Sequence, residues 1–307
     1  MHTTLQDFRK YLEPAVLARV TGLDLRARLL VQGFISGLHR SELHGFSVEF
    51  AEHRKYSQGD DLRHLDWKVY GRTDKHYIKE YEQETNLKLL LAVDCSESMR
   101  YQSRGSVFSK RDYATTTAAA LAYLALHQAD AVALATFDTR LHRTGRATNN
   151  PAQWKHVVQD LEKADGHGRT AFRTVFDELA ETLHDRHLIV IMSDFLGPTD
   201  QIISGIKHLR HRRHEPIVLQ VLDHAELTFP FDRPIEFEGL EGAGTLVTNP
   251  RLMRERYLAE MNAHIERLRR GCFEQRIDFE VLDTQAPLNT ALSAYLATRA
   301  SRSRRRN

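Results

Sequence analysis

From residue 87 onward, compact apolar runs alternate with amphipathic helical segments, and this alternation restricts the fold more than any other feature of the sequence. The apolar runs predict buried strands at Leu87–Val93, Ala131–Phe137, Leu188–Met192, Ile217–Leu222 and Ile277–Leu282. Helices are expected near residues 114–129, 152–161, 171–184, 200–212, after Pro250, and from Pro287 to about Ala300. Repeated strand–helix–strand units need right-handed crossovers, so we expect an α/β fold with a doubly wound, mostly parallel sheet flanked by helices.

The N-terminal segment has a different texture and predicts a helical and short-strand extension. Apolar residues recur at helical spacing in two groups, Leu5, Phe8, Leu12 and Val16, then Leu25, Leu29 and Leu38. Residues 46–86 mix short apolar pieces with charge, as exposed strands do. We therefore divide the chain into an N-terminal module (1–86), an α/β domain (87–300) and a disordered basic tail (301–307). The polar stretch at 223–247 predicts a surface hairpin.

Charge and cysteine content exclude several classes of protein. The 307 residues carry 43 basic and 41 acidic side chains, so the net charge of +2 gives no global attraction to nucleic acid or to a membrane. The two cysteines are too few for a disulfide framework and suit a reducing compartment. Since no run approaches the ~18 apolar residues that span a bilayer and no secretory leader opens the chain, we expect a cytoplasmic protein without its own transmembrane segment.

Oxygen-bearing side chains follow two of the predicted strands and one loop. Asp94, Ser96 and Ser98 come directly after the first strand, Thr170 follows a loop that contains Gly168, and Asp194 closes a later strand. Ligands of open parallel sheets bind beyond the carboxyl ends of the strands, so these side chains are the first candidates for a site. Alternate spacing lets the first three residues aim at one point.

Two carboxylates and three hydroxyls form a donor set for a hard cation. Mg²⁺ takes about six oxygen ligands and retains some waters, so such a site leaves a position open, and Mn²⁺ or Ca²⁺ are possible substitutes. Two negative charges leave the ion electrophilic enough to accept a carboxylate from another molecule. We therefore expect recognition of an acidic residue on a client protein.

This pattern resembles the metal-ion-dependent adhesion site of von Willebrand factor A domains. All five positions of that motif match here, and they are Asp94, Ser96, Ser98, Thr170 and Asp194. The resemblance implies that the serines and Thr170 contact the metal directly or nearly so, with the aspartates often acting through water. It also implies the parallel-sheet fold expected above.

An upstream segment resembles the hallmark of the bacterial domain-of-unknown-function 58 family. The matching residues are Glu49-Phe50, Arg54-Lys55-Tyr56, Gly59-Asp60-Asp61, Arg63 and Asp66-Trp67-Lys68. Members of that family are commonly encoded beside MoxR-type AAA+ ATPases and are thought to act with them in chaperone-like assembly or metal insertion. The resemblance therefore implies a MoxR-type ATPase as a partner. Many members also carry N-terminal membrane helices, which this sequence lacks.

Several alternatives stay open. A Mg²⁺-dependent phosphohydrolase also uses a strand-end aspartate, but Ser96 stands where such enzymes usually place a second aspartate as acid and base. A third alternative is a scaffold with an empty metal site. We expect no enzymatic activity and no catalytic residues, because no general base adjoins the five positions. The Gly59-Asp60-Asp61 segment is either an internal clasp or a partner surface, and the clasp is favoured.

A second cluster carries histidine. His208, His211 and His214 recur every three residues near a predicted helix end, with three arginines interspersed. Repulsion from those arginines opposes a bound cation, so the pattern predicts a solvated helix face rather than a zinc site.

Overall fold

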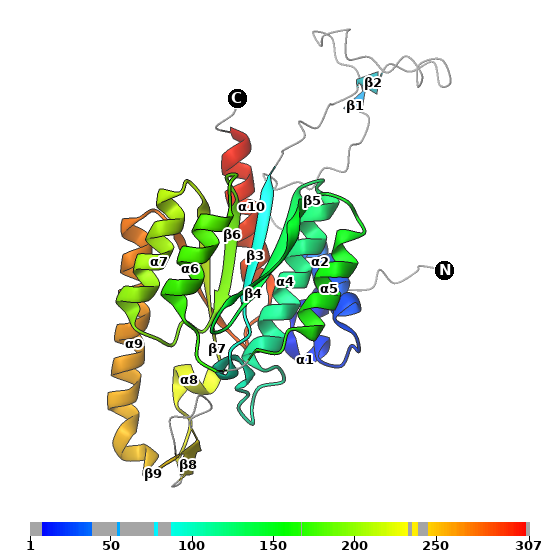
Figure 1. Cartoon of the computed structure of the whole chain (residues 1–307). Coiled ribbons are helices and arrows are strands. Elements are labelled where there is room, and N and C mark those ends of the chain that lie inside the picture. Colours follow the sequence, from blue (N-terminus) through cyan, green and yellow to red (C-terminus); the bar gives the residue numbers. More distant parts are fainter. Residues whose placement is uncertain are drawn as a thin grey trace, which may run out of the picture.

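The computed structural model describes residues 8–38, 54–55, 77–78, 87–166, 168–232, 235–238 and 245–304. Its centre is one six-stranded sheet in the order β10-β7-β6-β3-β4-β5 (Figure 1). The strands are β3 (Lys88–Asp94), β4 (Ala131–Phe137), β5 (Leu141–Thr148), β6 (Leu188–Ser193), β7 (Glu215–Leu222) and β10 (Asp278–Asp283). All neighbours are parallel except β5, which pairs antiparallel with β4. The prediction of a mostly parallel, doubly wound α/β fold is confirmed.

Helices cover both faces of the sheet and create two hydrophobic cores (Figure 1). One face is covered by α2 (Leu23–Leu38), α4 (Lys110–His127), α5 (Gln153–Lys163) and α10 (Asn289–Arg304). The other is covered by α6 (Phe172–Thr182), α7 (Thr199–His211) and α9 (Pro250–Glu274). In β3, Leu89 and Leu91 enter the first core, whereas Leu90 enters the second. A strand buried on both faces must be apolar throughout, which explains the continuous run in the sequence.

The opening of the chain is not one helix through Val16, as its periodicity predicts. It forms a 3₁₀ turn, η1 (Phe8–Leu12), and a separate short helix, α1 (Pro14–Leu17). Glu13 is extended, with ψ of 126°. A residue before proline avoids the helical region, and Pro14 has no N–H to continue a helix, so the two pieces separate there.

Helix α2 was predicted correctly and Leu29 packs against the core as expected, but Leu25 does not. Leu25, which we placed on the apolar face, is 46% exposed. The face that packs consists of Leu23, Ala27, Leu30, Val31 and Phe34. These side chains join the same core as α4, α5 and the sheet, so the N-terminal helices share a core with the α/β domain.

The polar stretch after β7 contains a hairpin, as predicted. A short helix α8 (His224–Thr228) comes first, and β8 (Ile235–Glu238) then pairs antiparallel with β9 (Thr245–Thr248). Farther upstream, β1 (Arg54–Lys55) pairs antiparallel with β2 (Tyr77–Ile78). The Gly59-Asp60-Asp61 segment and the residues from Arg63 to Lys68 lie outside the described residues. The internal clasp therefore stays a prediction.

Three further findings concern strand β5, the histidine cluster and the C-terminal helix. The sequence did not predict β5, because its residues after Leu141 are polar or small and only its pairing with β4 makes it a strand. His214 lies beyond the end of α7 and is 1% exposed, so the solvated-face interpretation is wrong for this residue. Helix α10 continues to Arg304, into the tail expected to be irregular. Arginines suit a helix C-terminus because the negative end of the helix dipole attracts their charge. Among the described residues, no helix is long and apolar enough to cross a bilayer.

Candidate site at the carboxyl ends of β3 and β6

Asp94 ends β3 and is fully buried. Its Oδ1 accepts a hydrogen bond of 2.9 Å from the backbone N–H of Ser96, which turns the chain into the short 3₁₀ helix η4 (Glu97–Arg100). The same turn brings the hydroxyls of Ser96 and Ser98 to 3.2 Å from each other. Ser96 is buried and Ser98 is half-buried, so solvent reaches this turn at Ser98 and not at Ser96.

Thr170 reaches Asp94 from a distant loop. Its hydroxyl lies 3.0 Å from Oδ1 and 3.1 Å from Oδ2 of Asp94. Gly168, with φ of +74°, makes the required left-handed turn and accepts a hydrogen bond from the N–H of Glu97 at 3.3 Å. Gly166 passes so close that a Cβ there would lie 2.3 Å from the carbonyl oxygen of Cys95. The loop is thus held against the β3 turn by backbone contacts that only glycine allows.

Strand β6 supplies Ser193 and Asp194, because it runs parallel beside β3. The Ser193 hydroxyl donates to Asp94 Oδ2 at 2.5 Å and accepts from the N–H of Phe195 at 2.9 Å. Asp194 is 1% exposed; its Oδ1 accepts from the N–H of Leu196 at 3.1 Å. The two aspartates therefore end neighbouring strands inside the protein.

Among the described residues, the donors that hold the Asp94 carboxylate are neutral: a backbone N–H and the hydroxyls of Thr170 and Ser193. Burial and the nearby charge of Asp194 together raise the pKa of Asp94 to about 7, against the lowering effect of its hydrogen bonds. A buried carboxylate without a cationic partner is costly to ionise, so this position favours an added cation.

Lys110 is the cation that contacts this group of acids, and it is buried as deeply as they are. Lys110 begins α4, is 1% exposed, and places its ammonium 2.8 Å from Asp194 Oδ2 and 2.7 Å from Glu226 Oε1. Burial lowers the pKa of Lys110, but the charges of Asp194 and Glu226 outweigh it and the net shift is upward. The ammonium is therefore charged throughout the physiological range.

The structure brings the five sequence-predicted residues together, four of them by direct hydrogen bonds and Asp194 by its charge. Direct hydrogen bonds connect Asp94 with Ser96 and Thr170, and Ser96 with Ser98. Asp194 joins through its charge on Asp94, while one of its own oxygens is engaged by the ammonium. The sequence reasoning missed Ser193, Lys110 and Glu226. No direct signal for Lys110 was visible in the sequence, because the helix was expected to begin only at residue 114. In the structure Lys110 is the first residue of α4, where a basic side chain is disfavoured by the helix dipole and needs a local reason.

The donor chemistry fits a hard divalent cation. The ammonium of Lys110 contacts the carboxylates of Asp194 and Glu226, and Asp94 lies close enough to feel the charge of Asp194, so three acids and one ammonium leave two negative charges when all are ionised. Hydroxyl and carboxylate oxygens are the ligands that Mg²⁺ and Ca²⁺ prefer. Within the part of the chain that the structure describes, no three His, Cys, Asp or Glu side chains form a metal-holding group. A metal here would depend on hydroxyls as well as acids.

A protein-family model, described as "Protein of unknown function DUF58", matches residues 52–267, well over half of the chain. The chain is a member of the DUF58 family. The matched region contains every candidate site residue named above, from Asp94 to Glu226.

Curated relatives of this DUF58 protein have no described function. It is 29% identical over 225 residues to the uncharacterized protein Rv1480 of Mycobacterium tuberculosis, covering 71% of this chain and 68% of the relative. The uncharacterized protein Mb1516 of Mycobacterium bovis matches over the same extent, at 29% identity and with 71% and 68% coverage.

Solved structures show distant likenesses. BatB from Bacteroides thetaiotaomicron matches with a TM-score of 0.45 and 15% identity, covering 70% of this chain and 99% of that one. The pilus adhesin SpaC from Lactobacillus rhamnosus GG matches with a TM-score of 0.44 and 11% identity, covering 70% of this chain and 30% of that one. Neither likeness carries an argument about function.

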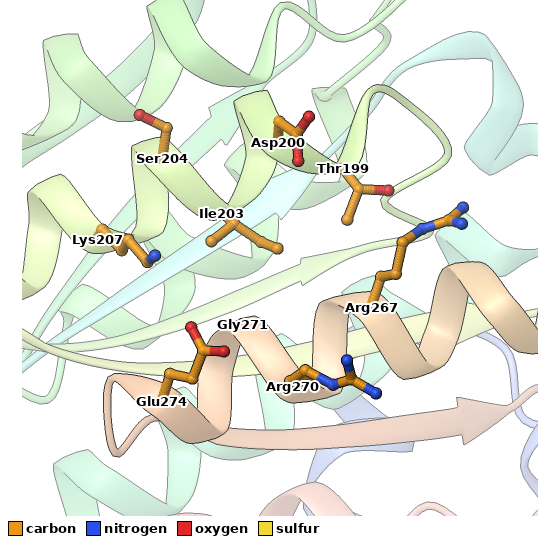
Figure 2. A pocket seen from close by; sticks show the side chains of 9 residues that line it. All are labelled: Thr199, Asp200, Ile203, Ser204, Lys207, Arg267, Arg270, Gly271 and Glu274. Atoms are coloured by element: carbon orange, nitrogen blue, oxygen red, sulfur yellow. The ribbon is translucent and has the colours of Figure 1, made fainter.

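A pocket of about 400 Å³ lies elsewhere in this DUF58 protein, between α7 and α9 (Figure 2). Its walls carry charges of both signs, among them Lys207, Arg267 and Glu274. Gly271 forms its floor, and a Cβ at that position would lie 2.4 Å from Ile203 Cδ1, so the two helices approach closely there. None of the five predicted site residues lines this pocket.

One side chain of α9 connects this helix pair to the candidate site. His264 Nε2 donates to the carbonyl oxygen of Phe195 at 2.9 Å, which leaves Nδ1 to accept from the Thr199 hydroxyl at 3.1 Å. Burial lowers the pKa of His264, in keeping with a neutral ring in this role. The loop that follows Asp194 is therefore held between β6 and α9.

Proposed function

We propose that this DUF58 protein is a metal-dependent protein-binding adaptor and not itself an enzyme. A divalent cation, Mg²⁺ first and Mn²⁺ or Ca²⁺ as substitutes, is held by Asp94, Ser96, Ser98, Thr170 and Asp194. The proposed partners are a MoxR-type AAA+ ATPase and a client protein that presents an acidic side chain. Such an ATPase uses ATP, so the proposed encounter takes place in the cytoplasm.

One observation carries the proposal: the fully buried Asp94 has neutral hydrogen-bond donors alone within the described part of the chain, and it stands beside a second buried aspartate. Asp194 has the ammonium of Lys110 as a partner, so the uncompensated charge is that of Asp94. Ionising such a buried carboxylate destabilises a fold, and a divalent cation would remove that cost. When bound, the ion supplies an electrophilic position for a carboxylate ligand. Ser98 and Thr170 are half-buried, so they form the side of the site from which a partner can approach.

The chain's own residues explain why binding is favoured over catalysis. Both oxygens of Asp94 accept hydrogen bonds, Oδ1 from Ser96 and Thr170, and Oδ2 from Thr170 and Ser193. A carboxylate held on both oxygens is oriented as a ligand and is a poor nucleophile. The phosphohydrolase alternative gains no support from this geometry.

The scaffold alternative has one observation in its favour, the ion pair between Lys110 and Asp194. In that alternative the Lys110 ammonium neutralises Asp194 and no metal binds. Thermal unfolding in 5 mM MgCl₂ and in EDTA separates the two, because a ligand that binds only the folded state raises the melting temperature. A rise that Asp94→Ala abolishes supports the adaptor, whereas identical melting curves favour the scaffold.

The partner is tested by co-purification. Tagged protein is used to capture the MoxR-type ATPase encoded in the same genome, with Mg²⁺ or with EDTA. We expect capture by the wild-type protein in Mg²⁺ and loss of capture in EDTA or with Asp94→Ala. Asp185→Ala, which removes an exposed carboxylate elsewhere, is the matched control and should capture normally. Capture that persists in EDTA and with Asp94→Ala contradicts the metal-dependent mechanism.

A further inference from the structure

Lys110 stands in an unfavourable position unless its two carboxylate partners are considered. It is the first residue of an 18-residue helix, where the helix dipole repels positive charge, and it is 1% exposed. Its ammonium lies between Asp194 and Glu226, whose side chains are 2% and 14% exposed. The ring of Tyr101 lies 5.8 Å away and also favours a cation. The site therefore contains a permanent positive charge.

This ammonium and a divalent cation would share one ligand. Asp194 is a proposed metal ligand, and its Oδ2 already accepts from Lys110 at 2.8 Å. Two like charges that share one carboxylate in a buried site repel each other strongly, since screening by water is weak there. Lys110 must therefore oppose metal binding as long as it stays on Asp194.

Glu226 offers the ammonium a second position. It is held by α8, where the N–H of Asp223 donates to Glu226 Oε2 at 2.8 Å and completes a capping box. Asp223 in turn accepts from the N–H of Ser103 at 3.0 Å, which fixes α8 to the loop after η4. Glu226 Oε1 thus faces Lys110 from a fixed element, at 2.7 Å.

We propose that Lys110 is a built-in competitor of the divalent cation for Asp194, and that Glu226 holds the Lys110 ammonium when the metal takes this ligand. The inference rests on the proposed function and assigns its regulation. It makes the affinity for metal depend on a residue that never touches the metal. It also links metal occupancy to α8, which lies at the carboxyl end of the sheet (Figure 1).

The test is titration of MgCl₂ into metal-free protein by calorimetry. We expect Lys110→Gln to bind Mg²⁺ at least about tenfold more tightly, because a repelling charge is gone, and Glu226→Gln to bind about tenfold more weakly. Lys88→Gln is the control for the loss of one positive charge; Lys88 begins the strand that Asp94 ends, about 20 Å away at ~3.3 Å per residue. This control should bind as the wild-type protein does.

The double variant Lys110→Gln/Glu226→Gln separates an indirect effect of Glu226 from a direct one. Glu226 acts through Lys110 in this proposal, so its substitution should have little effect once Lys110 is gone. An undiminished tenfold loss in the Lys110→Gln background contradicts the role assigned to Glu226. Where Lys110→Gln does not fold without metal, Glu226→Gln alone carries the test, and unchanged affinity overturns the inference.

The outcomes also distinguish this inference from the proposed function. Tight binding by wild-type protein with no gain in folded Lys110→Gln overturns the inference and leaves the adaptor proposal intact. Binding by Lys110→Gln but not by the wild-type protein supports competition and overturns the metal-dependent adaptor. Binding by neither folded protein overturns both.

Discussion

Strands β3, β6 and β7 carry polar groups at both ends, and the two ends of the sheet treat these groups differently. At the amino end, Lys88 pairs with Asp185 at 2.6 Å, with the two side chains 38% and 65% exposed, and Arg186 pairs with Glu215. At the carboxyl end, Asp94 and Asp194 are at most 1% exposed, and one ammonium is shared between Asp194 and Glu226.

The two ends differ in what their charges cost in folding stability. Exposed ion pairs are screened by water and contribute little to stability in either direction. Buried acids in excess of buried cations destabilise the folded state, and packing alone does not require them. Charge of this kind at strand ends is the pattern expected of a binding site, where local stability is given up for function.

The largest effect on stability should come from adding a side chain at Gly166, which packs against the backbone of Cys95 at the carboxyl end of the sheet. Gly166→Ala places a Cβ 2.3 Å from the backbone oxygen of Cys95, so the loop that carries Thr170 must move. We expect a loss of about 3 kcal/mol in the free energy of unfolding and loss of the Mg²⁺ response. Urea unfolding with and without MgCl₂ measures both.

Gly105→Ala is the matched control, because its Cβ would meet only the end of the Gln285 side chain, at 3.3 Å. Equal stability losses in the two variants would mean that the close approach at Gly166 has no special role.

The amino end also has buried polar side chains, His187 and His214, and His214 is the more deeply buried of the two. Burial and, to a smaller extent, the charges of His187 and Arg212 lower the pKa of His214 to about 4. Between pH 6.5 and 4 the unfolded chain therefore binds a proton that the folded protein does not bind. The contribution of His214 to the free energy of unfolding is fully present above pH 6.5 and is lost as the pH falls toward 4. We expect about 2 kcal/mol less stability at pH 5 than at pH 7 from this residue.

Urea unfolding of the wild-type protein and His214→Asn at both pH values checks this. Asparagine retains an acceptor for the N–H of His187, which now donates to His214 Nδ1 at 3.3 Å. The loss of stability between pH 7 and pH 5 should be about 2 kcal/mol smaller in the variant than in the wild-type protein. An equal loss in the two proteins would contradict the role assigned to His214.

A smaller effect is expected from Asp223, the buried cap that ends β7 at the carboxyl edge. It accepts from the N–H groups of Ala225 at 2.8 Å and Ser103 at 3.0 Å. Asp223→Ala should cost about 1 to 2 kcal/mol, because it removes a helix cap and leaves a half-buried donor unpaired. Asn249→Ala, at the exposed cap of α9, should cost less in the same thermal denaturation series. The reverse order would mean that burial of the cap does not matter.

The smallest effect should come from the exposed ion pair at the amino end. Lys88→Gln removes the partner of Asp185, and we expect no change in the melting temperature beyond experimental error, since both side chains are solvated. A clear drop would remove the contrast between the two ends of the sheet.

Much of the fold was predictable because burial imposes periodicity on the chain. The apolar runs predicted β3, β4, β6, β7 and β10, and all five are present. Strand β5 escaped prediction because pairing with β4 creates it, and the first helix failed at Pro14 because periodicity ignores backbone chemistry.

The candidate site divides in the same way. Asp94, Ser96 and Ser98 were predictable as a group, because a turn at a strand end is a local property. Lys110 and Glu226 were not, because their contacts join residues 84 and 116 positions apart. Whether this group binds a metal stays a prediction.

The sequence by itself determined the alternation of strands and helices and placed oxygen-bearing residues at strand ends, since both follow from which neighbouring side chains are apolar. The tertiary structure decided that β3 and β6 lie side by side and that α4 and α8 bring an ammonium and a third carboxylate to the same point. Strand order and helix placement depend on burying two faces of the sheet at once, and no local pattern contains that information.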